Sequence, residues 1–319
     1  MWFGDDAAAV AMPGPGPSVA PSPHASLLLL ATDAVVAGID ADLSLTSLSD
    51  LGWKAMAVNL SDIAAMGGTA AYALVSVIGA GLDELDQLYA GILEAAATYS
   101  CPVVGGDLSA GTELAVSVAV AGWVSGPPVL RSGARPGDTI WVTGRLGAAA
   151  AGLRLLREAG SSRPTGPDRW SGREADLIRA HARPTPALGA GAQARAAGAT
   201  AMIDVSDGLV TDIAQLAELS GVGFELVDIP LAPGATLDEG LGGGDDYVLA
   251  FTVSPAPALP AYGPKSSGPS TLSEETGPAE AFVRAGLPAP HLIGKCLPDP
   301  TERLLSGRRL EITGWEHSL

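Results

Sequence analysis

The stretch DLGWKAMAVNLSDIAAMG, residues 50–67, determines most of what the sequence says about the fold. Its apolar side chains recur at helical spacing, which predicts a helix over residues 51–66; they include Trp53, Ala57, Leu60 and Ala64. We expect Asp50 to cap the helix and Gly67 to end it. Asp62 points away from the apolar face, and a lone carboxylate in apolar surroundings is costly unless something compensates its charge.

Further segments place aspartate where an apolar run is expected to end. They are GDD (residues 4–6), ATD (31–33), GGD (105–107) and IDVSDG (203–208). Two unit charges about 4 Å apart repel by roughly 4 kcal/mol at an effective dielectric near 20. If these carboxylates converge, cations are needed between them. Because Mg²⁺ prefers oxygen ligands, the pattern predicts a site for magnesium and phosphate.

Each segment also has a simpler interpretation. A plain turn accounts equally well for Asp33 or for the GGD and GDD segments, and a salt bridge inside the core accounts for Asp62. Ser206 or Asp207 is explained as the N-cap of the next helix, although Asp204 is then left unexplained. The free N–H groups at the start of that helix suit a phosphate. An arginine fork at Arg131 also suits phosphate.

Composition excludes several classes of protein. The chain has 319 residues, is 47% hydrophobic and carries a formal net charge of -17, with no basic stripe. We therefore expect no nucleic-acid partner and no anionic membrane partner. The longest apolar run is interrupted and too short to span a membrane, and no signal peptide is evident. The separated Cys101 and Cys296 are expected to be buried thiols, which fits a cytoplasmic location.

Strand and helix patterns predict an α/β chain in two parts. The first part combines strands near residues 27–31, 72–78, 102–104 and 114–123 with helices over 51–66 and 82–98. A Gly-Pro-Pro linker follows at residues 126–128. Strands at 139–143, 201–205 and 247–253 then alternate with helices, and residues 254–280 are expected to form a loop. We place the domains at residues 1–126 and 127–319.

The order of these segments resembles that of the thiamine-monophosphate kinases, in the aminoimidazole-ribonucleotide-synthetase-like superfamily. The resemblance covers about residues 4–253, and residues 50–67 are its most specific part. It implies a two-domain α+β fold in which the N-terminal sheet closes a barrel with the sheet of the partner in a homodimer. It also implies transfer of the γ-phosphate of ATP onto thiamine phosphate, with several magnesium ions bridging the phosphates.

The resemblance implies a role for each matching residue. The implied magnesium ligands are Asp6, Thr32, Asp33, Asp62, Asp107, Asp204 and Asp207; of these, Asp62, Asp107, Asp204 and Asp207 act in catalysis through the metal. The implied ATP contacts are Gly106, Asp107, Arg131, Ser206 and Tyr89. The implied contacts with thiamine phosphate are Asp40, Asp245 and Trp315.

The chain departs from the family pattern mainly on the substrate side. Asp40 replaces a histidine, Ala110 replaces an arginine, and Ala148 replaces an aspartate. The final phenylalanine of the C-terminal pattern is Ser318. These departures leave two alternatives open: a superfamily member with another substrate, and a non-catalytic relative that binds nucleotide and metal.

Overall fold

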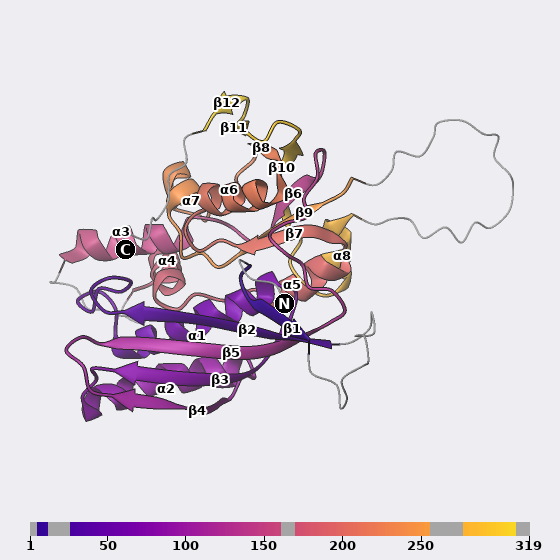
Figure 1. The fold of residues 1–319 in the computed structure, drawn as a ribbon. Coiled ribbons are helices and arrows are strands. Elements are labelled where there is room, and N and C mark those ends of the chain that lie inside the picture. Colours follow the sequence, from indigo (N-terminus) through magenta and orange to yellow (C-terminus); the bar gives the residue numbers. More distant parts are fainter. Residues whose placement is uncertain (1–4, 12–25, 161–169, 256–276, 311–319) are drawn as a thin grey trace, which may run out of the picture.

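The computed structural model describes residues 5–11, 26–160, 170–255 and 277–310 (Figure 1). They form a five-stranded sheet of order β1-β2-β5-β3-β4 and a seven-stranded sheet of order β12-β11-β8-β10-β6-β9-β7. Neither sheet closes on itself. Antiparallel pairs predominate, and β3–β4 and β8–β11 are the parallel pairs among the described strands. The chain is therefore an α+β protein with mixed sheets.

The first sheet has helices on one face only. Its strands are β1 (Ala8–Ala11), β2 (Ser26–Val36), β3 (Thr69–Ile78), β4 (Val103–Ser109) and β5 (Ala115–Ser125). Helices α1 (Leu48–Ala65) and α2 (Leu82–Thr98) lie behind it in Figure 1. Alternate residues of β5 are fully buried against these helices, among them Val116 and Val118. The opposite face of the sheet carries no described helix.

Helix α1 is enclosed on nearly every side. Of its 18 residues, all are buried except Leu48, Ser49 and Asp62. A helix that is largely apolar on every side belongs in a core rather than on a surface. The expected N-cap at Asp50 is wrong, because Ser47 caps the helix and accepts a hydrogen bond from the Asp50 N–H. Asp50 lies in the first turn, where a carboxylate favours the helix dipole.

The second sheet comprises β6 (Thr139–Val142), β7 (Ala199–Asp204), β8 (Gly223–Leu226), β9 (Leu249–Val253), β10 (His291–Leu297), β11 (Arg303–Leu305) and β12 (Arg308–Arg309). Its helices are α3 (Ala148–Ala159), α4 (Gly172–Ala182), α5 (Leu188–Ala196), α6 (Leu209–Ser220), α7 (Leu237–Gly242) and α8 (Pro278–Arg284). One of its apolar clusters includes Ala64 and Ala65 of α1 beside Phe251 and Phe282. Helix α1 thus contributes to the cores under both sheets.

Polar contacts also join α1 to the second half of the chain. The Trp53 indole N–H donates to the carbonyl of Pro184 (2.9 Å). The Arg183 guanidinium pairs with Asp50 (2.5 Å) and lies 5.3 Å from the centre of the Trp53 ring. These buried and half-buried contacts fix the second half against the end of α1 that precedes Asp62.

Several predicted boundaries differ from the structure. The helix over residues 82–98 is confirmed as α2. The strand expected to end before Thr32 instead continues to Val36, and the short strand expected to end before the GGD segment continues through it as β4. Asp33 and Asp107 therefore project from strands and not from turns. Residues 256–276 of the expected loop lie outside the described residues, and 278–284 form α8.

Candidate functional site

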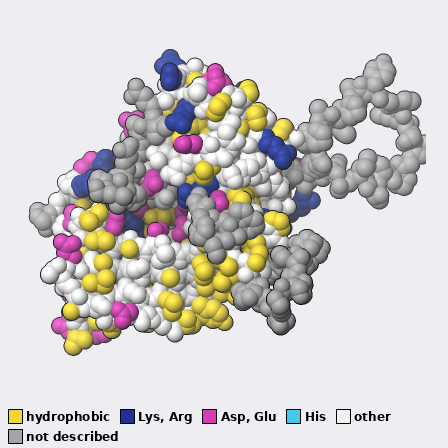
Figure 2. Space-filling view, in the orientation of Figure 1, with side chains coloured by type: hydrophobic (Ala, Val, Ile, Leu, Met, Phe, Trp, Pro, Cys, Tyr) yellow, Lys and Arg dark blue, Asp and Glu magenta, His cyan; other side chains and the backbone are white. Residues whose placement is uncertain are grey.

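A cavity of about 820 Å³ lies between α1, the end of β2 and the loops of the second half. Figure 2 shows acidic side chains gathered around a recess in the middle of this face. Carboxylates outnumber cations along the cavity wall. The carboxylates are Asp5, Asp6, Asp33, Asp40, Asp42, Asp62, Asp204, Asp207 and Asp245, and the lysine and arginines are Lys54, Arg131 and Arg157. Such a wall favours bound cations.

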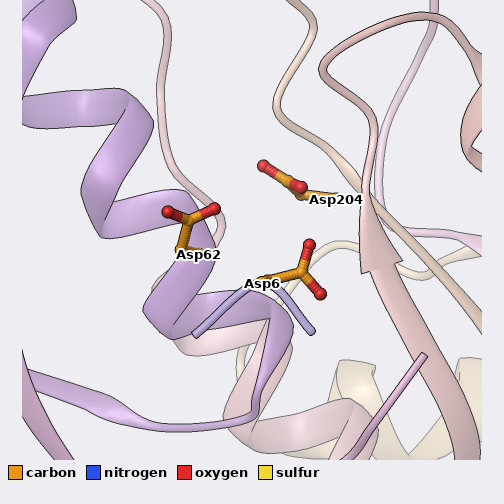
Figure 3. A group of neighbouring side chains, drawn as sticks. All are labelled: Asp6, Asp62 and Asp204. Atoms are coloured by element: carbon orange, nitrogen blue, oxygen red, sulfur yellow. The ribbon is translucent and has the colours of Figure 1, made fainter. Parts of the chain in front are cut away.

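Three of the carboxylates form a compact group (Figure 3). One oxygen from each of Asp6, Asp62 and Asp204 lies within 4.8 Å of the others. Asp6 precedes β1, Asp62 lies on α1, and Asp204 ends β7. The fold therefore brings together residues that are far apart in the sequence. Asp204 also accepts a hydrogen bond from the Ser61 hydroxyl (2.6 Å).

The group is electrostatically unfavourable without a cation. Burial raises the pKa of Asp62 well above its usual value, and Asp204, Asp33 and Asp6 raise it further. Burial and then Asp6 likewise raise the pKa of Asp204. The second oxygen of Asp6, Oδ2, is buried and has no hydrogen-bond partner among the described residues. An unsatisfied buried carboxylate oxygen beside two further carboxylates fits a divalent metal.

Arg131 holds the acidic N-terminal segment in place. Its Nη2 pairs with Asp6 Oδ1 (2.8 Å), and its backbone N–H donates to Asp5 Oδ1 (2.5 Å). Its Nη1 donates to Gln215 on α6 (3.1 Å). The guanidinium lines the cavity, and its Nε is buried without a hydrogen-bond partner among the described residues.

Asp212 occupies the amide groups that we expected to bind phosphate. Its Oδ2 accepts hydrogen bonds from the N–H groups of Ser206 (3.1 Å), Asp207 (3.2 Å) and Gly208 (3.1 Å). Burial, followed by the charge of Asp207, raises the pKa of Asp212 to about 8. These three amides are therefore not free to bind phosphate, and the prediction that they do so is wrong. The signal missed was an aspartate four residues after Gly208, within reach of those amides.

Other predicted residues also line the cavity. Thr32, Asp33, Asp40, Ser206, Asp207 and Asp245 are all in its wall. The Asp33 N–H donates to the Asn59 side chain on α1 (2.8 Å), which fixes β2 against the helix. Asp40 Oδ2 accepts from the Val36 N–H (2.8 Å) and so stabilises the turn after β2.

Some predicted residues lie elsewhere. Gly106 and Asp107 are exposed on β4, and β5 and β3 separate that strand from β2. Three strand spacings amount to about 14 Å, so one chain does not bring Asp107 to Asp33. Tyr89 packs against the apolar core of the first sheet and is absent from the cavity wall. Trp315 lies outside the described residues.

The prediction overlooked a second polar group in the cavity. The Lys54 ammonium pairs with Asp245 Oδ2 (2.6 Å), and the Tyr247 hydroxyl donates to Asp245 Oδ1 (3.1 Å). His181 of α4 lines the same cavity. Burial and then the charge of Lys54 lower the pKa of His181 to about 4, so its ring is uncharged at neutral pH. The available signal was a single lysine, the only basic residue in a largely apolar helix.

Comparisons with known proteins agree over most of the chain. The profile of the AIR synthase related protein, N-terminal domain, matches residues 4–124, and that of the C-terminal domain matches residues 135–259. The chain is 36% identical over 244 residues to the thiamine-monophosphate kinase of Bacillus subtilis, covering 72% of this chain and 74% of that protein. It is 38% identical over 277 residues to that of Mycobacterium tuberculosis, covering 80% and 75%.

Solved structures show the same similarity. AaThiL complexed with AMPPCP and TMP is 30% identical with a TM-score of 0.78, covering 99% of this chain and 92% of that chain. The thiamine-monophosphate kinase of Stenotrophomonas maltophilia is 29% identical with a TM-score of 0.73, covering 89% and 87%. No described helix of this chain is long and apolar enough to cross a membrane.

Proposed function

The chain belongs to the AIR synthase related protein family and, within it, to the thiamine-monophosphate kinases, and on this basis we propose that it transfers the γ-phosphate of ATP to thiamine phosphate. One observation carries the proposal most directly. Asp6, Asp62 and Asp204 converge from separate segments within 4.8 Å, in a cavity between the two halves of the chain. Phosphoryl transfer depends mainly on charge neutralisation and alignment, which such a group serves.

Magnesium is the metal that fits this donor set. The ligands offered are carboxylate oxygens, burial and then neighbouring carboxylates raise the pKa of Asp62 and Asp204, and Asp6 has a buried oxygen without a partner among the described residues. The other magnesium ligands that we propose on the cavity wall are Thr32, Asp33 and Asp207. When bound, the ions supply positive charge that neutralises and orients the polyphosphate. Asp107 completes the proposed set, but only if a second chain supplies it.

The residues of this chain have distinct tasks in the proposed reaction. Arg131 keeps Asp6 in place and presents positive charge to the nucleotide, while the Ser206 hydroxyl lies on the same wall. Asp212 holds the loop carrying Ser206 and Asp207 through three backbone hydrogen bonds. Holding both reactants in line lowers the barrier without a covalent intermediate. No described residue needs to act as a nucleophile.

On the acceptor side we assign Asp40, Asp245 and Trp315 to thiamine phosphate. The substrate carries a cationic thiazolium ring as well as a phosphate. A carboxylate at Asp40, where the family pattern has histidine, therefore suits the ring and not the phosphate. Asp40 and Asp245 both line the cavity, which supports their assignment to the acceptor substrate.

We also propose that the chain forms a homodimer through the open face of the first sheet. Large apolar side chains are exposed on strands of that sheet, namely Leu30, Tyr72, Leu74 and Trp123. Figure 2 shows hydrophobic atoms over the lower part of the molecule, where this sheet lies. An exposed patch of this kind marks an interface. In such a dimer the sheets would close a barrel, and Gly106 and Asp107 on β4 would face the nucleotide of the partner. No contact among the described residues supports the proposed role of Tyr89.

Two further expectations from the sequence stand as proposals. We propose a division into domains at residues 1–126 and 127–319, which places the two sheets in separate units joined through α1. We propose a cytoplasmic location because the buried Cys101 and Cys296 are free thiols.

The proposed activity is tested by measuring ADP release from ATP in the presence of magnesium, with and without thiamine phosphate. We expect release that depends on thiamine phosphate, with thiamine diphosphate as the product. Binding of an ATP analogue without substrate-dependent ADP release would instead identify a non-catalytic relative. ADP release with a different phosphorylated acceptor would identify another substrate.

A further inference from the structure

Helix α1 presents two polar side chains to the second half of the chain. Lys54 and Ser61 are seven residues apart, which places them on one side of the helix and separates them by about 10 Å along its axis. Ser61 donates to Asp204 in the carboxylate group, and Lys54 pairs with Asp245. One helix therefore positions both the carboxylate group and a second polar pair in the cavity wall.

The contact between Lys54 and Asp245 is buried on the lysine side. The Lys54 side chain is 7% exposed, whereas that of Asp245 is 33% exposed and lines the cavity. A buried ammonium group is costly unless it is paired, so Asp245 is the partner that makes Lys54 tolerable in an apolar helix. Asp245 in turn has one oxygen bonded to Lys54 and the other to the Tyr247 hydroxyl.

The backbone around Asp245 is held in a conformation that its residues rarely adopt. Asp245 has φ +59° and Tyr247 has φ +49°, both in the left-handed region. Non-glycine residues persist there only when their surroundings hold them. The Asp245 N–H donates to the Ser206 carbonyl (2.7 Å) and the Tyr247 N–H to the Val205 carbonyl (2.9 Å). The loop is therefore fixed against the end of β7 that carries Asp204.

We propose that Lys54 is a positioning residue for the acceptor substrate, which it serves by orienting Asp245 to receive the cationic or amine-bearing part of thiamine phosphate. This inference rests on the proposed function. Lys54 and Tyr247 each occupy one oxygen of Asp245, and the remaining lone pairs of that carboxylate are available to the cavity. Because the Lys54 ammonium offsets its charge, Asp245 acts on this part of the substrate mainly as a fixed hydrogen-bond acceptor.

One further observation strengthens the inference. His181 faces the pair but is uncharged at neutral pH, because burial and Lys54 lower its pKa to about 4. It therefore does not replace Lys54 as the cationic partner of Asp245.

The test compares Lys54→Met with Arg183→Met in the full chain. Arg183 is a matched control, because it also ties α1 to the second half through an ion pair but does not line the cavity. We expect Lys54→Met to raise KM for thiamine phosphate about tenfold or more while KM for ATP changes less than about twofold, since tenfold corresponds to about 1.4 kcal/mol of lost binding. Arg183→Met should lower Tm without changing either KM.

Conservative variants keep the test decisive if Lys54→Met fails to fold. Lys54→Arg should recover part of the affinity for thiamine phosphate, and Asp245→Asn should reproduce the defect. A merely structural Lys54 would lower Tm and leave KM for thiamine phosphate unchanged in Lys54→Met and Lys54→Arg, while Asp245→Asn still raises it, and this outcome would overturn the inference. If the unmodified protein shows no ADP release dependent on thiamine phosphate, the proposed function fails instead, so the two failures are distinguishable.

Discussion

Asp62 is a residue whose charge destabilises the cation-free protein. Its pKa is raised by burial and by Asp204, Asp33 and Asp6, so the ionised form is unfavourable in the folded state. We expect Asp62→Asn to raise Tm of the metal-free protein by a few degrees and to reduce turnover about 100-fold or more. Thermal unfolding in EDTA and a coupled ADP assay measure the two effects.

Magnesium provides the control for Asp62. A ligand that binds only the folded protein raises its stability by mass action. Tm of the unmodified protein should therefore rise with magnesium concentration, and Asp62→Asn should weaken this response. Asp86→Asn, an exposed change on α2, should leave turnover and the magnesium response intact. Full activity in Asp62→Asn would rule out a catalytic metal group at this position.

His181 predicts a pH dependence of stability. Its pKa is lowered from 6.5 to about 4 in the folded state, by burial first and then by Lys54 and Arg157. Between these values the unfolded chain binds more protons, so the stability contribution is present above pH 6.5 and is lost as the pH falls towards 4. At pH 5 the free energy of unfolding should be lower by about 2 kcal/mol than at pH 7, when each value is taken relative to that of His181→Gln.

Urea denaturation of both proteins at pH 7 and pH 5 measures this effect. The stability difference between the unmodified protein and His181→Gln should shift in favour of the variant at the lower pH. Because both proteins share every other titrating group, the difference isolates the histidine. An unchanged difference between the two pH values would show that the His181 ring is open to solvent.

At the scale of secondary-structure elements, the close contact between helices α1 and α2 depends on glycine. A Cβ atom added at Gly91 would lie 1.7 Å from the Ser49 carbonyl oxygen, and one at Gly52 would lie 2.1 Å from the Leu88 carbonyl oxygen. Because both obstacles are backbone, the helices must separate to accept a side chain. We expect Gly91→Ala to lower the free energy of unfolding by about 3 kcal/mol, measured by urea denaturation.

Gly189 on α5 is the control for this change. A Cβ atom there meets only the Leu287 side chain, at an ordinary 3.6 Å. Alanine is the better helix former, so Gly189→Ala should leave stability unchanged or raise it by up to about 1 kcal/mol. Equal effects at Gly91 and Gly189 would mean that α1 and α2 are not packed as closely as the structure shows.

The sequence predicted elements best where their pattern was long. Helix α2 has a strong amphipathic period and clear ends, and it was predicted to the residue. Strand ends were predicted poorly, because an apolar run locates the buried part of a strand and not its exposed continuation. Both β2 and β4 continue through polar residues that pair with neighbouring strands, and this pairing cannot be inferred from the segment itself.

The candidate site shows the same limit. The convergence of Asp6, Asp62 and Asp204 was predicted, because aspartates recur where apolar runs were expected to end, Asp62 stood alone in apolar surroundings, and the family resemblance implied a shared metal role. Asp212 and Lys54 were overlooked, because their roles depend on partners from another turn or from the other half of the chain. The position of Asp107 away from the cavity follows from strand order, which the sequence did not contain as a local signal.

At the scale of the whole molecule, the open sheet face predicts the oligomeric state. Leu74 is 50% exposed on β3, an inner strand of the first sheet, and a charge there would oppose burial in an interface. We expect Leu74→Arg to convert the proposed dimer to monomers in sedimentation experiments while circular dichroism stays unchanged. Turnover should fall with the dimer if Asp107 acts on the nucleotide of the partner.

Leu82 is the control for the change at Leu74. It is 84% exposed at the start of α2, on the other side of the sheet. Leu82→Arg should therefore leave the sedimentation behaviour and turnover unchanged. If the unmodified protein sediments as a monomer and is fully active, both the proposed dimer and the proposed role of Asp107 are refuted.

The enclosure of α1 has a consequence for sequence variation. An ordinary surface helix tolerates replacements on its solvent side, so a mutational scan across it alternates between tolerant and intolerant positions. The neighbours of α1 come from two sheets and from α2, α4 and α5. Almost no side of the helix therefore faces solvent and tolerates substitution. A saturation scan should therefore show an unbroken band of intolerance across residues 50–65, the same residues that form the most recognisable stretch of the chain.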